Sequence, residues 1–445
     1  MISVSRIIFM LTLALFLAGL PKVGYAQIDI PDEPAVILDG CGFLGSLPRK
    51  PRLVVPDMVP LAGSADRNAA IVSEYISDNL DLTGLFQIID KPDSLEENPE
   101  SGVLAGTEPD YEAWKKIGAD FLIKGGINIS GSKLTLELRL FDIALGKQML
   151  GKHYSGPSKD ARKIANQFTN AVLEAITGTP GVFGSEIIFA SGPLREKQIF
   201  KTTLGSDEAT QISTGLKRGY YQPTIGPNGS VAWVSRDREK KETWDLVRDG
   251  QVVSSGDLHL SPAFKPDGSL VAALSSPRQT AIYDFSVKPP KLLVGLGGIN
   301  VSPTFSPDGS RMAFVSDKEG VMSIFVATDS GESATRLTNG AKSTDPVWSP
   351  AGEYIAFVLR ETDICIIRPD GTGFRQLTGG QGANTRPSFS PDGRLIVFSS
   401  TRNQKQQLFI MNANGENQRP LMPNFKAPQE QPYWSPVWPD DSLDK

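Results

Sequence analysis

The sequence predicts a small α/β domain with a mixed sheet, followed by an all-β six-bladed propeller that is closed by the C-terminal strand. Three observations lead to this fold class. Strand-like and helix-like segments alternate over residues 50–178, and helical periodicity disappears beyond residue 184. A proline-rich motif then recurs at intervals of 39, 41, 43, 41 and 45 residues, a spacing typical of propeller blades built from four short strands.

Residues 1–26 have the pattern of a signal peptide. Arg6 precedes an uncharged run over residues 7–20, and Gly24-Tyr25-Ala26 supplies the small residues that a signal peptidase requires. The run is shorter than the roughly 20 residues of a membrane-spanning helix, although a retained membrane anchor stays open as the alternative. We therefore expect export from the cytoplasm, with cleavage after Ala26.

The segment 27–49 is expected to be an extended N-terminal segment of the exported chain. Apolar and acidic residues alternate in its first positions, which are Gln27, Ile28, Asp29, Ile30, Pro31 and Asp32. One interpretation is a frayed terminus. The other is a peptide that adds a strand to the sheet edge of a partner protein, because Ile-Asp-Ile alternation suits that mode of binding.

Residues 50–178 are predicted to form the α/β domain. Ser158 is expected to cap its last helix, and Gly178 is expected to end that helix. Strands are expected at 52–56, 85–90, 121–124, 134–140 and 148–154, and helices at 65–80, 111–117 and 158–177.

After a linker at 179–184, residues 185–445 are predicted to form the propeller. Each copy of the motif is interpreted as a strand, a tight turn and a second strand. In Ser306-Pro307-Asp308-Gly309 the proline, aspartate and glycine have the backbone preferences of a hairpin turn, so Asp308 is expected to be structural. The copies are marked by Pro223, Pro262, Pro303, Pro346, Pro387 and, in truncated form, Pro432.

The two ends of this region are each half of a blade. The last copy stops at Pro436 without a second strand, whereas residues 185–191 match a second strand that has no first strand before it. We expect Tyr433 and Trp434 to supply the innermost strand of the blade that residues 185–213 begin. This pairing would close the ring and cover strand edges that would otherwise be open.

The composition excludes several classes of function. The chain carries 45 Lys and Arg against 50 Asp and Glu, a formal net charge of −5. Binding to nucleic acid or to an anionic lipid surface requires clustered positive charge, so we predict neither a nucleic-acid partner nor direct membrane insertion. The two cysteines, Cys41 and Cys365, fall in different predicted segments, and we expect free thiols rather than a disulfide.

The chain has no recognisable pattern for catalysis or metal binding. Its two histidines, His153 and His259, fall in different predicted domains, and neither a Gly-x-Ser-x-Gly motif nor a neighbouring cysteine pair accompanies them. The glycine-rich stretch at 295–298 is not followed by a helix pattern that would hold a phosphate. We predict no catalytic residue, no cofactor and no metal, which leaves a binding role.

The chain resembles the TolB family, the periplasmic component of the Tol-Pal system. The resemblance rests on the Pro-x-(Phe/Trp)-Ser-Pro-Asp-Gly repeats, the export signal, the acidic N-terminal segment and the closing Pro432-Tyr-Trp-Ser-Pro436, beyond which this chain continues for nine residues. It implies a non-enzymatic periplasmic adaptor that is a monomer outside its complexes. The propeller would bind the peptidoglycan-associated lipoprotein Pal, and residues Gln27 to Pro34 would engage TolA, with other envelope proteins as further partners. Such an adaptor supports outer-membrane integrity and invagination during cell division.

A propeller of this kind is expected to bind its partner at one mouth of the central channel, where loops lead into the innermost strands. Aromatic and arginine side chains dominate binding energy at protein interfaces, which favours Tyr221 and Arg386 among the loop residues, and a solvated loop residue stays open as the alternative for each of them. Two alternatives stay open: an exported propeller enzyme, a hydrolase or a lyase, and a receptor for a small ligand. The loops contribute Tyr221, His259, Asn300, Asp345, Arg386 and Gln431.

Overall fold

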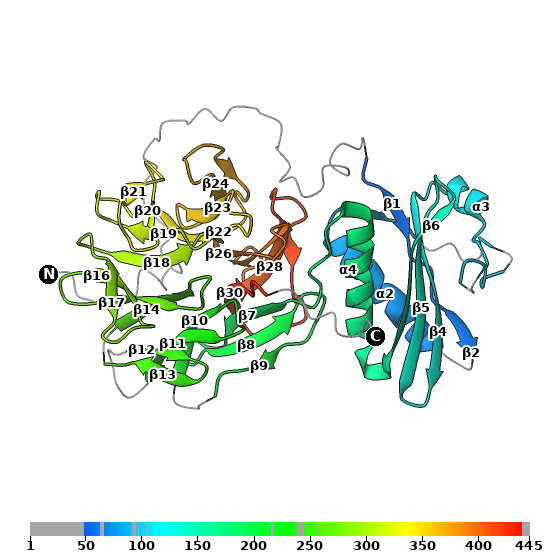
Figure 1. Cartoon of the computed structure of the whole chain (residues 1–445), viewed down its shortest axis with the longest axis horizontal. Helices are drawn as coiled ribbons and strands as arrows, with labels where there is room; N and C mark the ends of the chain where they lie inside the picture. Colours follow the sequence, from blue (N-terminus) through cyan, green and yellow to red (C-terminus); the bar gives the residue numbers. More distant parts are fainter. Residues whose placement is uncertain are drawn as a thin grey trace.

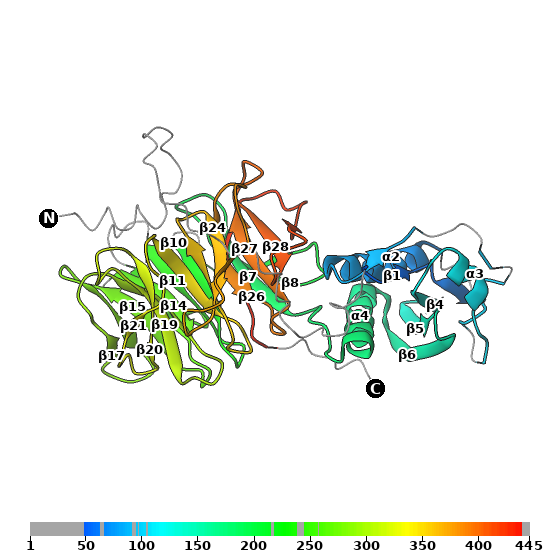
Figure 2. The same ribbon diagram turned by 90° about the horizontal axis from the view of Figure 1, so that it is seen from above.

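The computed structural model describes residues 49–437, apart from 63–65, 91–94, 97, 104–105, 215–217, 238–243 and 257. The predicted signal peptide, the segment Gln27 to Asp32 and Cys41 lie outside the described residues. The described chain has two parts, an α/β domain and a β-propeller, which lie side by side (Figures 1 and 2). None of the helices in the described ranges combines the length and apolar character that crossing a membrane requires.

The α/β domain is a mixed sheet in the order β3-β1-β4-β5-β6, with β2 paired to β4. β1 runs parallel to β3 and β4, and β2 runs parallel to β4, whereas β5 is antiparallel to both β4 and β6. The strands are β1 (Arg52–Val54), β2 (Val59–Ala62), β3 (Gln87–Ile88), β4 (Phe121–Ser130), β5 (Lys133–Asp142) and β6 (Lys147–Pro157). The helices are α2 (Asp66–Leu82), α3 (Tyr111–Lys116) and α4 (Ala161–Thr177).

Alternating leucines on β5 build the core of this domain. Leu134, Leu136, Leu138 and Leu140 are buried together with Phe168 of α4, as the strand period predicts. β4 runs further than the predicted strand, through Gly125 and Gly126. A Cβ atom at Gly125 would lie 2.4 Å from the sulfur of Met58, so the lack of a side chain at this position leaves room for Met58 to pack against the strand.

The last helix ends where the sequence predicts and begins later than predicted. Gly178 has φ 77° at the C-terminus, and its N–H donates to the carbonyl of Glu174 at 2.8 Å. Ser158 does not cap α4, because it begins a short 3-10 turn (Ser158–Asp160) that precedes the helix. Asp160 occupies the N-cap position of α4 and makes no capping bond with its side chain.

The propeller consists of short strands that form one eight-stranded and four four-stranded sheets within the described residues. In the eight-stranded sheet a single parallel pairing, Trp244 with Leu258, joins two four-stranded runs. The first run is β10 (Arg218–Ile225), β11 (Val231–Asp237), β12 (Trp244–Arg248) and β13 (Gln251–Ser254), and the second is β14 (Leu258–Phe264), β15 (Leu270–Ser275), β16 (Thr280–Asp284) and β17 (Lys291–Val294).

Three further sheets each follow one repeat of the sequence. They are β18 (Asn300–Phe305), β19 (Arg311–Ser316), β20 (Ser323–Thr328) and β21 (Thr335–Arg336); β22 (Ser343–Trp348), β23 (Ile355–Leu359), β24 (Asp363–Ile367) and β25 (Arg375–Gln376); and β26 (Asn384–Phe389), β27 (Leu395–Ser400), β28 (Gln407–Asn412) and β29 (Arg419–Pro420).

The remaining sheet joins the two ends of the propeller sequence, and we call it the seam sheet. Its order is β30-β7-β8-β9, with β7 (Glu186–Ser191), β8 (Gln198–Thr203), β9 (Thr210–Gln211) and β30 (Gln429–Trp434). β30 is antiparallel to β7, so that Tyr433 lies opposite Ile188 and Trp434 lies opposite Ile187.

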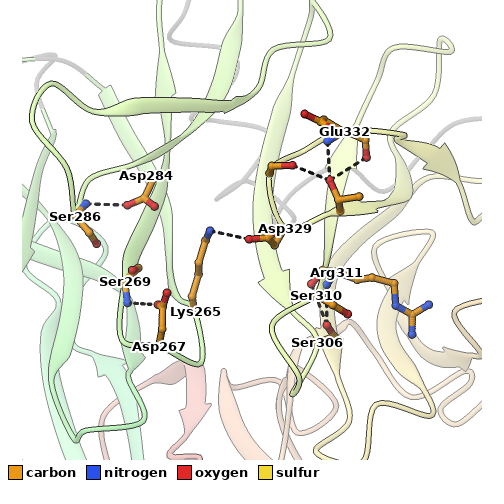
Figure 3. Close-up of polar contacts among 12 residues, drawn as sticks. Lys265, Asp267, Ser269, Asp284, Ser286, Ser306, Ser310, Arg311, Asp329 and Glu332 are labelled. Carbon is orange, nitrogen blue, oxygen red and sulfur yellow. Dashed lines mark hydrogen bonds and ion pairs between the residues drawn. The ribbon is translucent and has the colours of Figure 1, made fainter.

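The Ser-Pro-Asp-Gly segment after β18 is a hydrogen-bonded turn. The Ser306 hydroxyl donates to Asp308 Oδ1 at 2.5 Å, and Gly309 has φ 71°. Hydrogen bonds from Ser306 and from the hydroxyl and N–H of Ser310 lower the pKa of Asp308 to about 2. Figure 3 shows Ser306 and Ser310 of this turn beside the Asp267–Ser269 contact in the turn of the neighbouring repeat. The bonds that Asp308 accepts from Ser306 and Ser310 agree with its expected structural role.

Side chains from both parts hold the α/β domain against the propeller. The Asn170 amide of α4 accepts from Phe183 N–H at 2.9 Å and donates to the Phe183 carbonyl at 3.0 Å. Arg394 donates to the Thr177 hydroxyl at 2.8 Å, and Asn417 donates to the Leu82 carbonyl at 2.9 Å. One apolar core runs through this contact, from α2 and α4 to β27 and β28.

Candidate functional site

The first strands of the repeats surround a cavity. Its volume is about 480 Å³, and its lining comes from β10, β14, β18, β22, β26, β30 and the turns that follow them. These first strands adjoin one another in cyclic order, with β10 next to both β14 and β30. Proline rings and aromatic side chains make up much of the wall, and polar or charged residues make up about a third of the lining.

Six of the polar positions form a ring, which we call the girdle. Each girdle residue immediately precedes the motif proline of its repeat, has φ between 49° and 55°, and lies at an irregularity in the strand pairing. Such bulges redirect a side chain relative to its strand. The girdle consists of Gln222, Ser261, Ser302, Asp345, Arg386 and Gln431, all of which line the cavity.

Four of the six neighbouring pairs of girdle residues are joined by a hydrogen bond or an ion pair. The Gln431 Oε1 atom accepts from Gln222 N–H at 2.8 Å, and Gln222 Oε1 accepts from Ser261 N–H at 2.7 Å. The Ser261 and Ser302 hydroxyls lie 3.4 Å apart. On the other side, Arg386 Nε lies 3.1 Å from Asp345 Oδ1, with both side chains largely shielded from solvent. The girdle therefore holds the first strands of successive repeats in register around the cavity.

A second layer of polar side chains lies behind the girdle, two residues earlier in the strands. His259 Nδ1 lies 2.6 Å from the Trp244 carbonyl, and its Nε2 lies 3.0 Å from the Ser254 hydroxyl. The Asn300 amide donates to the Thr280 carbonyl at 2.9 Å. Each of these bonds reaches the preceding repeat, so this layer joins adjacent repeats.

The structure separates the six sequence-predicted residues into two groups. All six lie within strands, so the expectation that they belong to loops is wrong. Asp345, Arg386 and Gln431 are girdle residues and line the cavity. His259 and Asn300 are completely buried, and Tyr221 is 3% exposed with its hydroxyl bonded to the Leu194 carbonyl at 2.6 Å. These three side chains are buried and hydrogen-bonded inside the propeller, and they do not line the cavity.

Sequence reasoning missed Gln222, Ser261 and Ser302. The prediction aligned the repeats by where each strand was expected to start, which placed different repeats one or two residues out of step. Since successive side chains on a strand point to opposite faces, the slip of one residue at Tyr221 selects the opposite face of the strand. The slip of two residues at His259 and Asn300 selects a position on the far side of the bulge, in the buried second layer. Counting back one residue from each motif proline would have found all six girdle residues.

The described residues offer few groups for catalysis or metal binding. No group of three or more His, Cys, Asp or Glu side chains in the described ranges is placed to hold a metal ion. The Cys365 thiol is free and buried in β24, and burial raises its pKa to about 12. Such a thiol stays protonated at neutral pH and is a poor nucleophile.

Comparison with known proteins gives two family matches. Residues 173–438 match the family described as TolB beta propeller domain, and residues 48–149 match the TolB amino-terminal domain. The chain belongs to the TolB family. The two matches cover the propeller and much of the α/β domain, in agreement with the resemblance seen in the repeats.

Individual TolB proteins show similar relationships. The chain is 33% identical over 275 residues to the Tol-Pal system protein TolB of Desulfosudis oleivorans, covering 60% of this chain and 59% of the relative. It is 33% identical over 352 residues to a TolB homologue of Chlorobium chlorochromatii, covering 79% and 61%. The matches thus span about three fifths of the length of these relatives.

A solved TolB structure has the same fold. The crystal structure of TolB from Acinetobacter baumannii aligns with a TM-score of 0.73 at 20% identity, covering 87% of this chain and 97% of that chain. At this identity the likeness concerns the fold, and it includes both the α/β domain and the propeller.

Proposed function

We propose that this protein is a non-enzymatic adaptor of the Tol-Pal system in the periplasm. In this proposal the propeller binds the peptidoglycan-associated lipoprotein Pal at the central channel, and residues Gln27 to Asp32 engage TolA. The adaptor would thereby support outer-membrane integrity and invagination during cell division. The observation that carries the proposal is the match of both domains to the TolB family, whose relatives include named Tol-Pal system proteins.

The channel supports a binding role in this proposal. Asp345, Arg386 and Gln431 remain candidate contacts, and Gln222, Ser261 and Ser302 join them as members of the same girdle. We assign Tyr221, His259 and Asn300 a supporting role, since their buried side chains hold the strands that present the girdle. Arg386 is the strongest single candidate because arginine is enriched among residues that dominate interface energies.

We also propose the organisation that such an adaptor needs. A signal peptide at 1–26 is cleaved after Ala26, an extended segment at 27–49 leads into the α/β domain at 50–178, and a linker at 179–184 precedes a six-bladed propeller at 185–445. Two observations support closure of the ring by β30. This strand pairs with β7, and Gln431 of β30 accepts the bond from Gln222 of β10.

The test is capture of partners from a bacterial envelope extract by the immobilised mature protein. We expect Pal and TolA to be retained, and removal of residues 27–34 to abolish TolA retention alone. Arg386→Ala should weaken Pal binding about tenfold or more, as expected for loss of a hot-spot arginine. Lys291→Ala is the matched control, because it removes one positive charge from an exposed position on the outer strand β17.

The outcomes separate the adaptor from the alternatives. Equal Pal affinities for the Arg386 and Lys291 variants would contradict the assignment of the channel as the binding site. Failure to retain Pal, together with hydrolysis or lyase activity on envelope carbohydrates, would favour the exported enzyme instead.

A further inference from the structure

Two glutamines of the girdle have their hydrogen-bond orientation fixed. A backbone N–H can only donate, so the atoms that contact Gln222 N–H and Ser261 N–H must be amide oxygens. The oxygens of Gln431 and Gln222 are therefore engaged at 2.8 Å and 2.7 Å. Within the described part of the chain, no hydrogen-bond partner accepts from the side-chain NH2 group of either glutamine. Both NH2 groups belong to residues that line the cavity.

Arg386 adds further donors beside these amides. Its Nε atom lies 3.1 Å from Asp345 Oδ1, and the two terminal nitrogens of the guanidinium donate no hydrogen bond to another described residue. Arg386 lies on β26, Gln431 on β30 and Gln222 on β10, three first strands that adjoin in that order. The side-chain oxygens of Gln222 and Gln431 are therefore engaged by backbone N–H groups. The NH2 groups of these two glutamines and the terminal nitrogens of Arg386 remain as hydrogen-bond donors along one arc of the cavity wall, which we call the donor arc.

The charge of the cavity agrees with this arrangement. Its charged lining residues are Lys265, Arg386 and Asp345, two positive and one negative, which gives a net charge of +1. The whole chain has a formal net charge of −5, so the cavity lining differs in sign from the chain as a whole. Lys265 lies 3.4 Å from Asp329, whose side chain is 47% exposed (Figure 3). Solvent screens such a pair, so the ion pair between Lys265 and Asp329 is weak.

From these observations we propose that the donor arc of Arg386, Gln431 and Gln222 is a carboxylate-binding site, and that its ligand is an Asp or Glu side chain of an extended peptide. A guanidinium edge fits a carboxylate with two parallel hydrogen bonds, and two neutral NH2 groups extend that match without adding charge. The volume of about 480 Å³ lies within the roughly 300–1,000 Å³ of small-ligand pockets, which suits a few residues of extended chain.

Asp345 competes with the ligand for the same guanidinium, which provides a distinctive test. The probe is acetyl-Gly-Asp-Gly-amide, with the near-isosteric acetyl-Gly-Asn-Gly-amide as its neutral counterpart, titrated calorimetrically into the mature protein. We expect the Asp peptide to bind at least tenfold more tightly than the Asn peptide. Arg386→Gln and Gln431→Glu should each weaken the Asp peptide about tenfold or more, since charge-assisted hydrogen bonds are lost or a like charge is introduced.

Asp345→Asn should strengthen binding of the Asp peptide several-fold, because it releases Arg386 and removes a repelling charge. A girdle residue with only a structural role would weaken binding or change nothing, and Lys291→Ala should leave the affinity unchanged. No measurable binding at millimolar Asp peptide, equal affinities for the two peptides, or weaker binding by a folded Asp345→Asn variant would each overturn the proposal. Melting temperatures establish which variants are folded. The inference rests on the cavity alone, so Pal capture and peptide binding can succeed or fail separately.

Discussion

The seam sheet and the β18–β21 sheet have the same strand arrangement, although only the second is one continuous piece of chain. Gln429 lies opposite Ser191 as Asn300 lies opposite Ser316, and Trp434 lies opposite Ile187 as Phe305 lies opposite Met312. Both pairings shift register at the girdle residue. The same register thus forms with and without the connecting turn, which indicates that the strand pattern, more than the turn, specifies the pairing.

Several contacts hold β30 where the turn is missing. The Trp434 indole donates to the Ser185 hydroxyl at 2.8 Å, and Trp434 N–H donates to Ser388 Oγ at 2.9 Å. Gln431 N–H donates to Ser399 Oγ at 2.9 Å, and a largely buried ion pair joins Lys197, the residue before β8, to Glu430. These contacts bind β30 to the preceding repeat as well as to β7. The other first strands are joined to their second strands by a covalent turn, whereas β30 is held in its sheet by side-chain contacts and strand pairing alone.

Removing β30 should therefore have the largest effect. A chain that ends after Asn424 exposes the edges of β7 and of the neighbouring repeat, and it loses the buried Trp434. We expect the melting temperature of the whole propeller to fall by about ten degrees or more, since Trp→Ala changes in a core alone cost about 3–5 kcal/mol. Thermal unfolding followed by circular dichroism measures this effect.

A synthetic peptide of residues 425–437 provides the control for this truncation. Because β30 pairs without a covalent turn, the added peptide should restore most of the lost melting temperature in a concentration-dependent way. A truncated protein that melts at the original temperature would rule out β30 as the closing strand.

The sequence was sufficient for the parts of the fold that local chemistry determines. The turn at Asp308 and the end of α4 at Gly178 follow from backbone preferences, and the pairing of Trp434 with residues 185–191 follows from two incomplete repeats. The girdle could not be assigned in the same way. Its six positive φ angles and bulges shift the side-chain alternation inside each strand, and spacing alone does not reveal which of two adjacent residues faces the channel.

The ion pairs of the two regions should differ in strength. Lys197 lies 5.5 Å from the Tyr221 ring and pairs with Glu430, with side-chain exposures of 2% and 20%. Lys265 lies 5.5 Å from the Phe305 ring and pairs with Asp329, with exposures of 13% and 47%. Lys197→Met leaves a largely buried carboxylate without its partner and should cost about 2–4 kcal/mol, whereas Lys265→Met should cost about 0–1 kcal/mol.

Urea denaturation of the two variants measures this difference, and Lys197→Met with Glu430→Gln is the control. The double variant should recover part of the loss, because no uncompensated charge remains in the seam. Equal costs for the two lysine variants would show that β30 is no more dependent on its ion pair than an internal repeat.

The smallest effect concerns the turn aspartate that the seam sheet lacks. Hydrogen bonds from Ser306 and Ser310 lower the pKa of Asp308 to about 2, below the usual value of about 3.9 for an unfolded aspartate. The folded state therefore binds fewer protons, and the contribution of Asp308 to stability is present above about pH 4 and disappears as the pH falls toward 2. Asp308→Asn should lower stability slightly at pH 6, and its difference from the natural protein should shrink as the pH approaches 3.

Asp392 occupies the equivalent turn after β26 and predicts the opposite sign. Its Oδ1 atom also accepts from a serine hydroxyl at 2.5 Å, but burial raises its pKa, so its ionised form costs stability as the pH rises through that folded-state value. Asp392→Asn should therefore become relatively more stable than the natural protein as the pH increases. Urea denaturation between pH 3 and pH 7 follows both variants. Parallel pH profiles would mean that the shared turn, and not its surroundings, controls the two carboxyl groups.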